Sequence, residues 1–374
     1  MVGGVKAGAA PLERLRIERP TFLVDRERVA GNIQRMVDRA AAADVDLRPH
    51  FKTHRSRDIG RWFRDFGVSS ITVSSVEMAR YFVGDGWNDI TVAFPVNPRE
   101  ISYVAELSEH ARLSVLVDSV ASVELVAGIR AAGLRAWVKV DTGYRRAGID
   151  WEDDEELLAV GRAAHRAGLE LAGVLTHNGL VYRERGRDAV RRVHREGVER
   201  ARLARDLLSA AGLGDLAVSI GDTPGIGSGG PLDGVDEIRP GNFVFNDLTQ
   251  VAIGSCTSDE VAVAVACPVV SVYSRRGEAV LYGGSVHLGS ESLEQDGATA
   301  YGRVCPNWPV EADPGAPVVR LSQEHGVVRL EGEGARPMEP GDLACVLPVH
   351  SCITGYLHSR YLTLDGEWLD TMRA

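Results

Sequence analysis

A single lysine in a cationic segment is the first group in this sequence that could do chemistry. The segment RPHFKTHRSR, residues 48–57, contains Lys52 between His50 and His54, with three arginines close by. Positive neighbours favour the neutral form of an amine, and a neutral lysine can form a Schiff base with an aldehyde. The segment is therefore a candidate catalytic centre, although a solvated basic patch would have the same composition.

A glycine-rich segment is the second candidate. SIGDTPGIGSGGPL, residues 219–232, contains Thr223 and Ser228, and RPGNF downstream adds Gly241 and Asn242. Backbone amides and hydroxyls in such turns could hold a phosphate group. The segment lacks the GKS or GKT ending of a nucleotide P-loop. A reactive lysine and a phosphate cradle together predict pyridoxal phosphate, which has both an aldehyde and a phosphate, and Arg146 could then contact its phenolic oxygen or ring.

His350 and Cys352, in LPVHSCITGYLH, form a candidate metal site. On an extended strand, residues i and i+2 project from the same face, so both side chains could bind one ion. Imidazole nitrogen and thiolate sulfur suit Zn²⁺. Two protein ligands leave positions for water or substrate, which is typical of a catalytic rather than a structural site.

The elements that must position these residues are short apolar runs, which alternate with helical patterns from residue 21 to about 255. TFLVD, the run before RPHFK, and DEIRPGNFVF bring the number of strand and helix units to about eight. This pattern predicts an α/β fold with an N-terminal (β/α)8 TIM-like barrel over residues 20–255. Chemistry in such barrels lies at the carboxyl ends of the strands, where the candidate segments fall.

The pattern of apolar and polar residues changes after about residue 255. Short Val, Leu and Tyr runs are separated by Gly, Pro and Asp, with almost no helical periodicity. We expect a C-terminal antiparallel β-domain over residues 256–374, joined by residues 1–19, which carries the metal motif.

Composition excludes several classes of protein. The 374 residues carry a net charge of -10 without a continuous basic stripe, so nucleic acid is not an expected partner. No window of about 18 apolar residues occurs, and the first residues do not resemble a secretory signal, so we expect a cytoplasmic protein without a membrane partner. Five cysteines without a CxxC pair do not indicate a disulfide framework.

The motifs RPHFKTH, KVDTGYRRAG, LTHNG, SIGDTP, EIRPGNFVFND, SQEHG and PVHSC occur in one order between about Pro20 and Asp365. They resemble the pyridoxal-phosphate enzymes of the alanine-racemase fold (fold type III), in the branch that holds D-threonine aldolase and eukaryotic-type D-serine dehydratase. The resemblance implies that Lys52 bonds the cofactor, with Arg146 near its oxygen and Thr223, Gly241 and Asn242 at its phosphate. It also implies zinc at His350 and Cys352, a homodimer, and a small amino-acid substrate.

The metal motif bears on the reaction. By the same resemblance, aldolases of the branch usually carry His-x-Asp, whereas the D-serine and 3-hydroxyaspartate dehydratases carry His-x-Cys, as here. This favours a dehydratase that releases 2-oxo acid and ammonia from a β-hydroxy D-amino acid. Lys52 would take the Cα proton, His177 and Tyr182 are further candidate catalytic residues, and Asp141 is expected to orient a loop.

Several alternatives stay open. In a D-threonine-type aldolase, His177 would take the hydroxyl proton. In a racemase or epimerase, Tyr282 or Tyr301 would face the lysine. A pyridoxal-phosphate carrier would be a lone barrel, against which the β-domain argues. The segment 282–302 departs from the aldolase and dehydratase types and leaves the role of His287 open.

Overall fold

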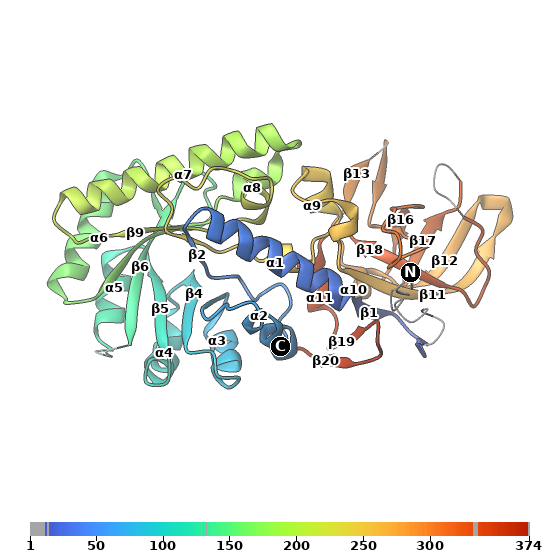
Figure 1. The fold of residues 1–374 in the computed structure, drawn as a ribbon, viewed down its shortest axis with the longest axis horizontal. Coiled ribbons are helices and arrows are strands. Elements are labelled where there is room, and N and C mark those ends of the chain that lie inside the picture. The colour runs from blue at the N-terminus through green and yellow to red at the C-terminus, as the bar shows by residue number, and fades with distance from the viewer. Residues whose placement is uncertain are drawn as a thin grey trace, which may run out of the picture.

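The computed structural model describes Leu12 and residues 15–129, 131, 133–295, 297–331 and 336–372. Most of the strands belong to two large sheets, and Figure 1 shows the barrel beside a second, strand-rich domain. No described helix is both long and apolar enough to cross a bilayer.

The first sheet is the predicted barrel. Its strands pair in parallel in the order β2-β10-β9-β8-β6-β5-β4-β3, and a parallel bridge between His50 and Thr72 joins the two ends. Strands such as β3 and β5 are buried along nearly their whole length, as expected when helices cover the outside. The barrel strands are β2 (Asp46–Leu47), β3 (Ile71–Val73), β4 (Asp89–Pro95), β5 (Arg112–Val117), β6 (Leu134–Asp141), β8 (Leu171–Thr176), β9 (Ala217–Ile220) and β10 (Glu237–Ile238), while β7 (Ile149–Asp150) pairs with β6.

Helices alternate with the barrel strands along the chain. Most begin at a Ser or Asp whose side chain accepts a backbone N–H of the first turn, for example Ser56, Ser75, Asp153 and Asp222. They are α1 (Arg26–Ala42), α2 (Arg57–Arg64), α3 (Val76–Val83), α4 (Ile101–Ser108), α5 (Val120–Ala127), α6 (Asp154–Arg166), α7 (Arg187–Ala210) and α8 (Thr223–Gly227).

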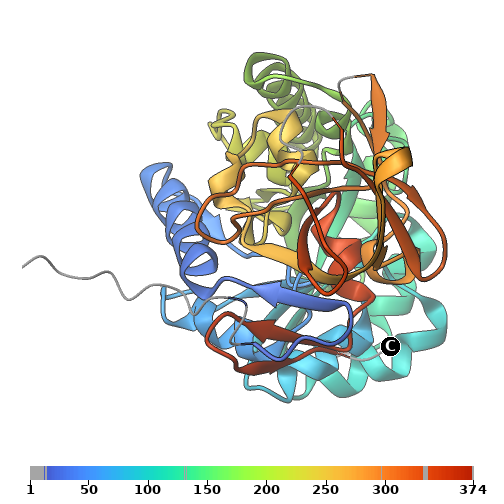
Figure 2. The ribbon, with the colours of Figure 1, turned by 90° about the vertical axis from the view of Figure 1, so that its right-hand side faces the viewer.

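The second sheet is largely antiparallel, as predicted, and Figure 2 shows it in front of the barrel. Its strands are β11 (Val263–Tyr273), β12 (Glu278–Tyr282), β15 (Gly302–Val304), β16 (Val318–Leu321), β17 (His325–Arg329), β18 (Leu343–Pro348), β19 (Arg360–Thr363) and β20 (Trp368–Asp370). A separate hairpin is formed by β13 (Leu293–Gln295) and β14 (Ala298–Ala300), and the helices are α9 (Leu248–Ile253), α10 (Ser285–Leu288) and α11 (Ser351–Tyr356).

One predicted barrel strand belongs to this second sheet. The run TFLVD forms β1 (Thr21–Val24), which pairs antiparallel with β11 and parallel with β19. An apolar run before a helix predicts a buried strand but does not specify its partner, so assigning TFLVD to the barrel was wrong. The domain limits of 20–255 and 256–374 stay a prediction, as does the part assigned to residues 1–19, most of which lie outside the described residues.

Candidate active site

A cavity of about 700 Å³ opens at the carboxyl ends of the barrel strands and is closed on one side by the start of α11. Residues from loops after several strands line it together. All nine predicted site residues are among them: Lys52, Arg146, His177, Tyr182, Thr223, Gly241, Asn242, His350 and Cys352. The structure therefore brings these residues to one place, while their individual roles stay predictions.

Lys52 lies in a turn just after the bridge that closes the barrel. Its backbone N–H donates to His50 Nδ1 at 3.3 Å, and its side chain lines the cavity. The preceding Phe51 is fully buried, and its ring packs against Phe63 and Trp87. The turn is thus anchored from behind by aromatic packing, which leaves the lysine on the open side.

The arginines near Lys52 in sequence do not surround it. Arg48 pairs with Glu237 and Asp89 inside the barrel, and the Arg55 guanidinium lies over Tyr356. The Arg57 guanidinium donates to the Tyr81 carbonyl. The prediction that these arginines surround the Lys52 amine was therefore wrong, because successive side chains of a turn point in different directions.

Cations from other strands take their place in the cavity. Lys139 on β6 and Arg239 after β10 line it beside Arg146. Burial, together with the charge of Arg239, lowers the pKa of Lys139 to about 7. Sequence reasoning missed both residues, although a lysine inside the apolar strand WVKVD was a visible signal.

The residues predicted to hold the phosphate lie in two turns that contact each other. The backbone N–H groups of Gly241 and Asn242 both point at Thr223 Oγ1, at 3.2 and 3.1 Å. A Cβ on Gly241 would lie 2.9 Å from the His50 carbonyl oxygen, and one on Gly221 would lie 2.7 Å from Arg239 Nη2. The convergent amides and hydroxyl and the close glycine packing fit the phosphate of pyridoxal phosphate, with Lys52 in the same cavity for its aldehyde.

The other glycines of that segment have structural positions. Cβ atoms at Gly225 and Gly230 would clash with the buried ring of His194, and one at Gly227 would contact Ser255. Of the glycine-rich segment 219–232, only Gly221, Asp222 and Thr223 line the cavity. Most of the glycine content thus serves close packing behind the site.

Arg146 is held through its backbone. Asp141, at the end of β6, accepts the N–H of Gly143 at 2.8 Å and that of Arg146 at 3.0 Å, so the predicted loop-orienting role of Asp141 is confirmed. The exposed Arg146 guanidinium lies 5.4 Å from the centre of the Tyr144 ring. It can therefore reach an anionic ring substituent in the cavity.

His177 and Tyr182 form one wall of the cavity, with ring centres 6.2 Å apart. His177 Nδ1 lies 2.5 Å from the Gly221 carbonyl, so this nitrogen carries the proton. Burial and the charges of Arg146 and Lys52 lower the pKa of His177 to about 3. Burial and the nearby Asp222 raise the pKa of Tyr182, so both side chains are neutral hydrogen-bonding groups near pH 7.

His50 and His54 differ in position. His50 lines the cavity, whereas His54 is fully buried and stacks on Phe63. Burial lowers the pKa of His54 to about 3. His54 thus has a packing role, while His50 is available to a ligand.

His350 and Cys352 meet, but they do not lie on a strand. β18 ends at Pro348, His350 is the extended residue before α11, and Cys352 lies in the first turn of that helix. The predicted strand was therefore wrong, because the run VLPV breaks at Pro348. The contact of the two side chains arises from a strand-to-helix junction instead.

Buried partners orient both members of this pair. The fully buried Asp247 lies 3.3 Å from His350 Nδ1, which leaves the other ring nitrogen for a ligand. Cys352 Sγ lies 3.2 Å from Thr53 Oγ1 and 3.4 Å from Asn242 Nδ2. Burial opposes ionisation of both groups, yet Cys352 and Asp247 raise the pKa of His350 to about 11, and the charge of His350 lowers the pKa of Cys352.

The donor types of this pair fit zinc. Among the described residues, no group of three or more His, Cys, Asp or Glu side chains could hold a metal ion. Any ion at His350 and Cys352 would therefore need further ligands from water or substrate.

The tyrosines considered for a racemase lie elsewhere. Tyr282 packs edge-on against His287 at 5.6 Å, and Tyr301 packs at the margin of the hydrophobic core. Neither tyrosine is among the residues that line this chain's cavity, and neither is His287.

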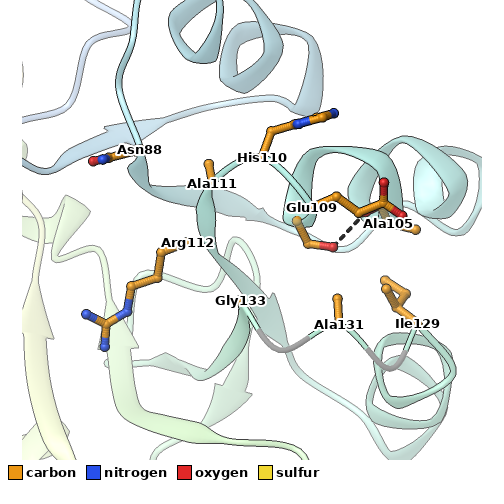
Figure 3. Close-up of a pocket in the computed structure, with 10 residues that line it drawn as sticks. Asn88, Ala105, Glu109, His110, Ala111, Arg112, Ile129, Ala131 and Gly133 are labelled. Atoms are coloured by element: carbon orange, nitrogen blue, oxygen red, sulfur yellow. Dashed lines mark hydrogen bonds between the residues drawn. The ribbon is translucent and has the colours of Figure 1, made fainter.

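A second hollow of about 680 Å³ lies at the opposite, amino ends of the strands. Figure 3 shows Asn88, His110 and Arg112 around it, with their side chains pointing apart. Its chemistry-bearing groups do not converge, so the active-site assignment stays with the cavity around Lys52.

Comparison with known proteins supports the same architecture. The alanine racemase N-terminal domain matches residues 24–248, and the putative serine dehydratase domain matches residues 262–364. D-threo-3-hydroxyaspartate dehydratase of Delftia sp. (strain HT23) is 32% identical over 369 residues, which cover 94% of this chain and 96% of the relative. D-serine dehydratase of Dictyostelium discoideum is 28% identical, with 93% of each chain covered.

Solved structures agree. The structure of the Delftia dehydratase superimposes with a TM-score of 0.89, covering 96% of this chain and 98% of that one. A cysteine variant of the same dehydratase, described as the metal-free form, gives 0.89 at 31% identity, with 96% of this chain and 98% of that one covered. The chain therefore belongs to the alanine-racemase-fold family in which this N-terminal domain is followed by the serine dehydratase domain, as its motifs predicted.

Proposed function

We propose that this chain is a pyridoxal-phosphate-dependent lyase that dehydrates a β-hydroxy D-amino acid to a 2-oxo acid and ammonia, with zinc at His350 and Cys352. The observation that carries the proposal is that Lys52 and the His350–Cys352 pair line one cavity. This reaction needs a proton acceptor for Cα, and a metal at His350 and Cys352 would activate the β-hydroxyl as a leaving group. The relatives named as D-threo-3-hydroxyaspartate and D-serine dehydratases support the substrate class.

The residues divide the work as follows. Pyridoxal phosphate, when bound, supplies the electron sink that makes the Cα proton acidic. Lys52 is the proposed acceptor of that proton, while Thr223, Gly241 and Asn242 hold the phosphate and Arg146 faces the ring. The amine of Lys52 is suited to this role because it reaches the cavity from a turn that packing fixes.

His350 and Cys352 would hold the zinc, which supplies Lewis-acid activation of a poor leaving group, hydroxide. Asp247 keeps the His350 ring oriented, and Thr53 and Asn242 hold the sulfur. His177 and Tyr182 are proposed to contact the substrate as neutral hydrogen-bonding groups. The low pKa of His177 makes it a weak base, which does not favour the aldolase alternative.

Product analysis with a matched variant tests this proposal. The protein, loaded with both cofactors, is incubated with D- and L-serine and with the 3-hydroxyaspartate isomers, while oxo acid and aldehyde are measured. We expect oxo acid from a D-substrate only, and loss of about 100-fold or more of this activity in Cys352→Ala, together with loss of bound zinc. Cys256→Ala is the control, since Cys256 is buried outside this cavity.

Other products would contradict the proposal. Glycine and an aldehyde would make the protein an aldolase, and inverted amino acid alone would make it a racemase. Full activity of Cys352→Ala without bound zinc would show that the reaction does not depend on the metal.

A further inference from the structure

The loop that carries Lys52 is tied to the last described residues of the chain. Asp370, at the end of β20, accepts the Arg57 backbone N–H at 3.1 Å and the Ser56 hydroxyl at 3.3 Å. In return, the Asp370 N–H donates to Asp58 Oδ2 at 3.0 Å. The first turn of α2 is thus capped by a residue about 310 positions away in sequence, and Figure 1 shows β20 beside α2.

Met372 makes a second tie. Its N–H donates to the Arg55 carbonyl at 2.6 Å, and Arg55 Nη2 donates to the Met372 carbonyl at 2.5 Å. Arg55 has a φ of 50°, in the left-handed region that non-glycine residues rarely adopt. Its guanidinium also lies 3.8 Å from the centre of the Tyr356 ring in α11. This unfavourable backbone conformation persists because contacts on both sides hold it.

The second carboxylate oxygen of Asp370 is also occupied. The Tyr81 hydroxyl of α3 donates to Asp370 Oδ2 and accepts the Arg57 N–H at 3.3 Å. Asp370 therefore joins α2, α3 and β20 at one point. A carboxylate with several charge-assisted hydrogen bonds contributes more than a neutral acceptor would.

These ties complete the anchoring of the turn that carries Lys52. On its amino side, His50 is fixed by the bridge to Thr72 that closes the barrel. On its carboxyl side, residues 55–58 are fixed by Asp370 and Met372. We propose that the segment Asp370–Met372 is a positioning element that holds the Lys52 turn in the geometry needed to bond the cofactor's aldehyde. This inference rests on the proposed role of Lys52.

A pair of ligands separates positioning from general stability. Pyridoxal phosphate can bond to Lys52, whereas pyridoxine phosphate has the same ring and phosphate but no aldehyde. In Asp370→Ala, we expect the Kd for pyridoxal phosphate to rise about tenfold and that for pyridoxine phosphate to change less than about twofold. Asp370→Asn keeps an acceptor oxygen and should lie between wild type and Asp370→Ala. Asp365→Ala is the control: it removes a carboxylate from the exposed turn before β20 and should match wild type.

Hydrogen exchange of the cofactor-free protein tests, without any ligand, whether Asp370–Met372 holds residues 55–58 in place. Amides of residues 55–58 should exchange at least about tenfold faster in Asp370→Ala, while those of β5 stay unchanged. Equal exchange in wild type and variant, or equal weakening of both ligands, would overturn the inference. Absence of bonded pyridoxal phosphate in the wild-type protein would instead overturn the proposed function of Lys52, and with it the positioning role.

Discussion

Lys139 shows how burial and charge set the behaviour of a single residue. Its side chain is only 6% exposed, and its Nζ donates to the Val140 carbonyl at 2.9 Å. The chain has three lysines, of which Lys52 and Lys139 both line the cavity. With a pKa of about 7, Lys139 carries little charge above neutral pH, which limits its repulsion of Arg239 and Arg146.

This depressed pKa predicts a pH-dependent stability. Above about pH 7, the folded state leaves Lys139 neutral, whereas the unfolded chain keeps it protonated up to about pH 10. The unfolded state therefore binds more protons, and the contribution of Lys139 to the free energy of unfolding becomes more favourable as pH rises. Between about pH 7 and about pH 9, the free energy of unfolding of the wild type should rise by about 2 kcal/mol relative to that of Lys139→Met. Urea titrations of both cofactor-free proteins measure it, and a difference independent of pH would contradict the assignment.

At the scale of elements, the predicted phosphate cradle depends on the close approach of two turns. The turn at Gly241 contacts the chain at His50, and the amides that follow point at Thr223. The cradle is therefore coupled to the Lys52 turn through backbone contact.

Gly241→Ala tests that coupling. The added Cβ would lie 2.9 Å from the His50 oxygen and 3.0 Å from the His50 Cβ, so the two turns must separate. We expect a loss of about 1–3 kcal/mol in the free energy of unfolding and about tenfold weaker binding of pyridoxal phosphate. Gly31→Ala in α1 is the control, because the nearest atom to its Cβ is 3.4 Å away at the end of the Arg35 side chain. Unchanged cofactor binding in Gly241→Ala would show that the turns are independent.

The elements also mark where sequence reasoning succeeded and failed. Most barrel strands were predicted because parallel strands buried on both faces read as continuous apolar runs. TFLVD and PVHSC were misassigned in part, since pairing partners and a strand-to-helix junction depend on long-range contacts that periodicity does not encode. The nine predicted site residues share one cavity, and they were chosen because they follow strand ends and match family motifs. Lys139 and Arg239 line the same cavity and were missed, Lys139 because it lies inside a strand pattern and Arg239 because it lies at the start of a turn. The contacts of Asp370 and Met372 with residues 55–58 join segments that are far apart in sequence, so no local pattern could predict them.

At the scale of the whole molecule, the site exists because two domains meet. The barrel contributes Lys52 and the phosphate cradle, and the second domain contributes His350 and Cys352 through α11. Thr53, next to Lys52, contacts Cys352, and Asp247, just before α9, contacts His350. The proposed cofactor and metal positions are thus joined by direct contacts, which would suit a reaction that breaks bonds at adjacent carbons.

Chemical trapping identifies the lysine that bonds the cofactor. The protein loaded with pyridoxal phosphate is reduced with borohydride, digested, and mapped by mass spectrometry. We expect the reduced cofactor on the peptide that contains Lys52, with none on the peptide that contains Lys139. Label on Lys139 instead, or on neither lysine, would contradict the central role given to Lys52.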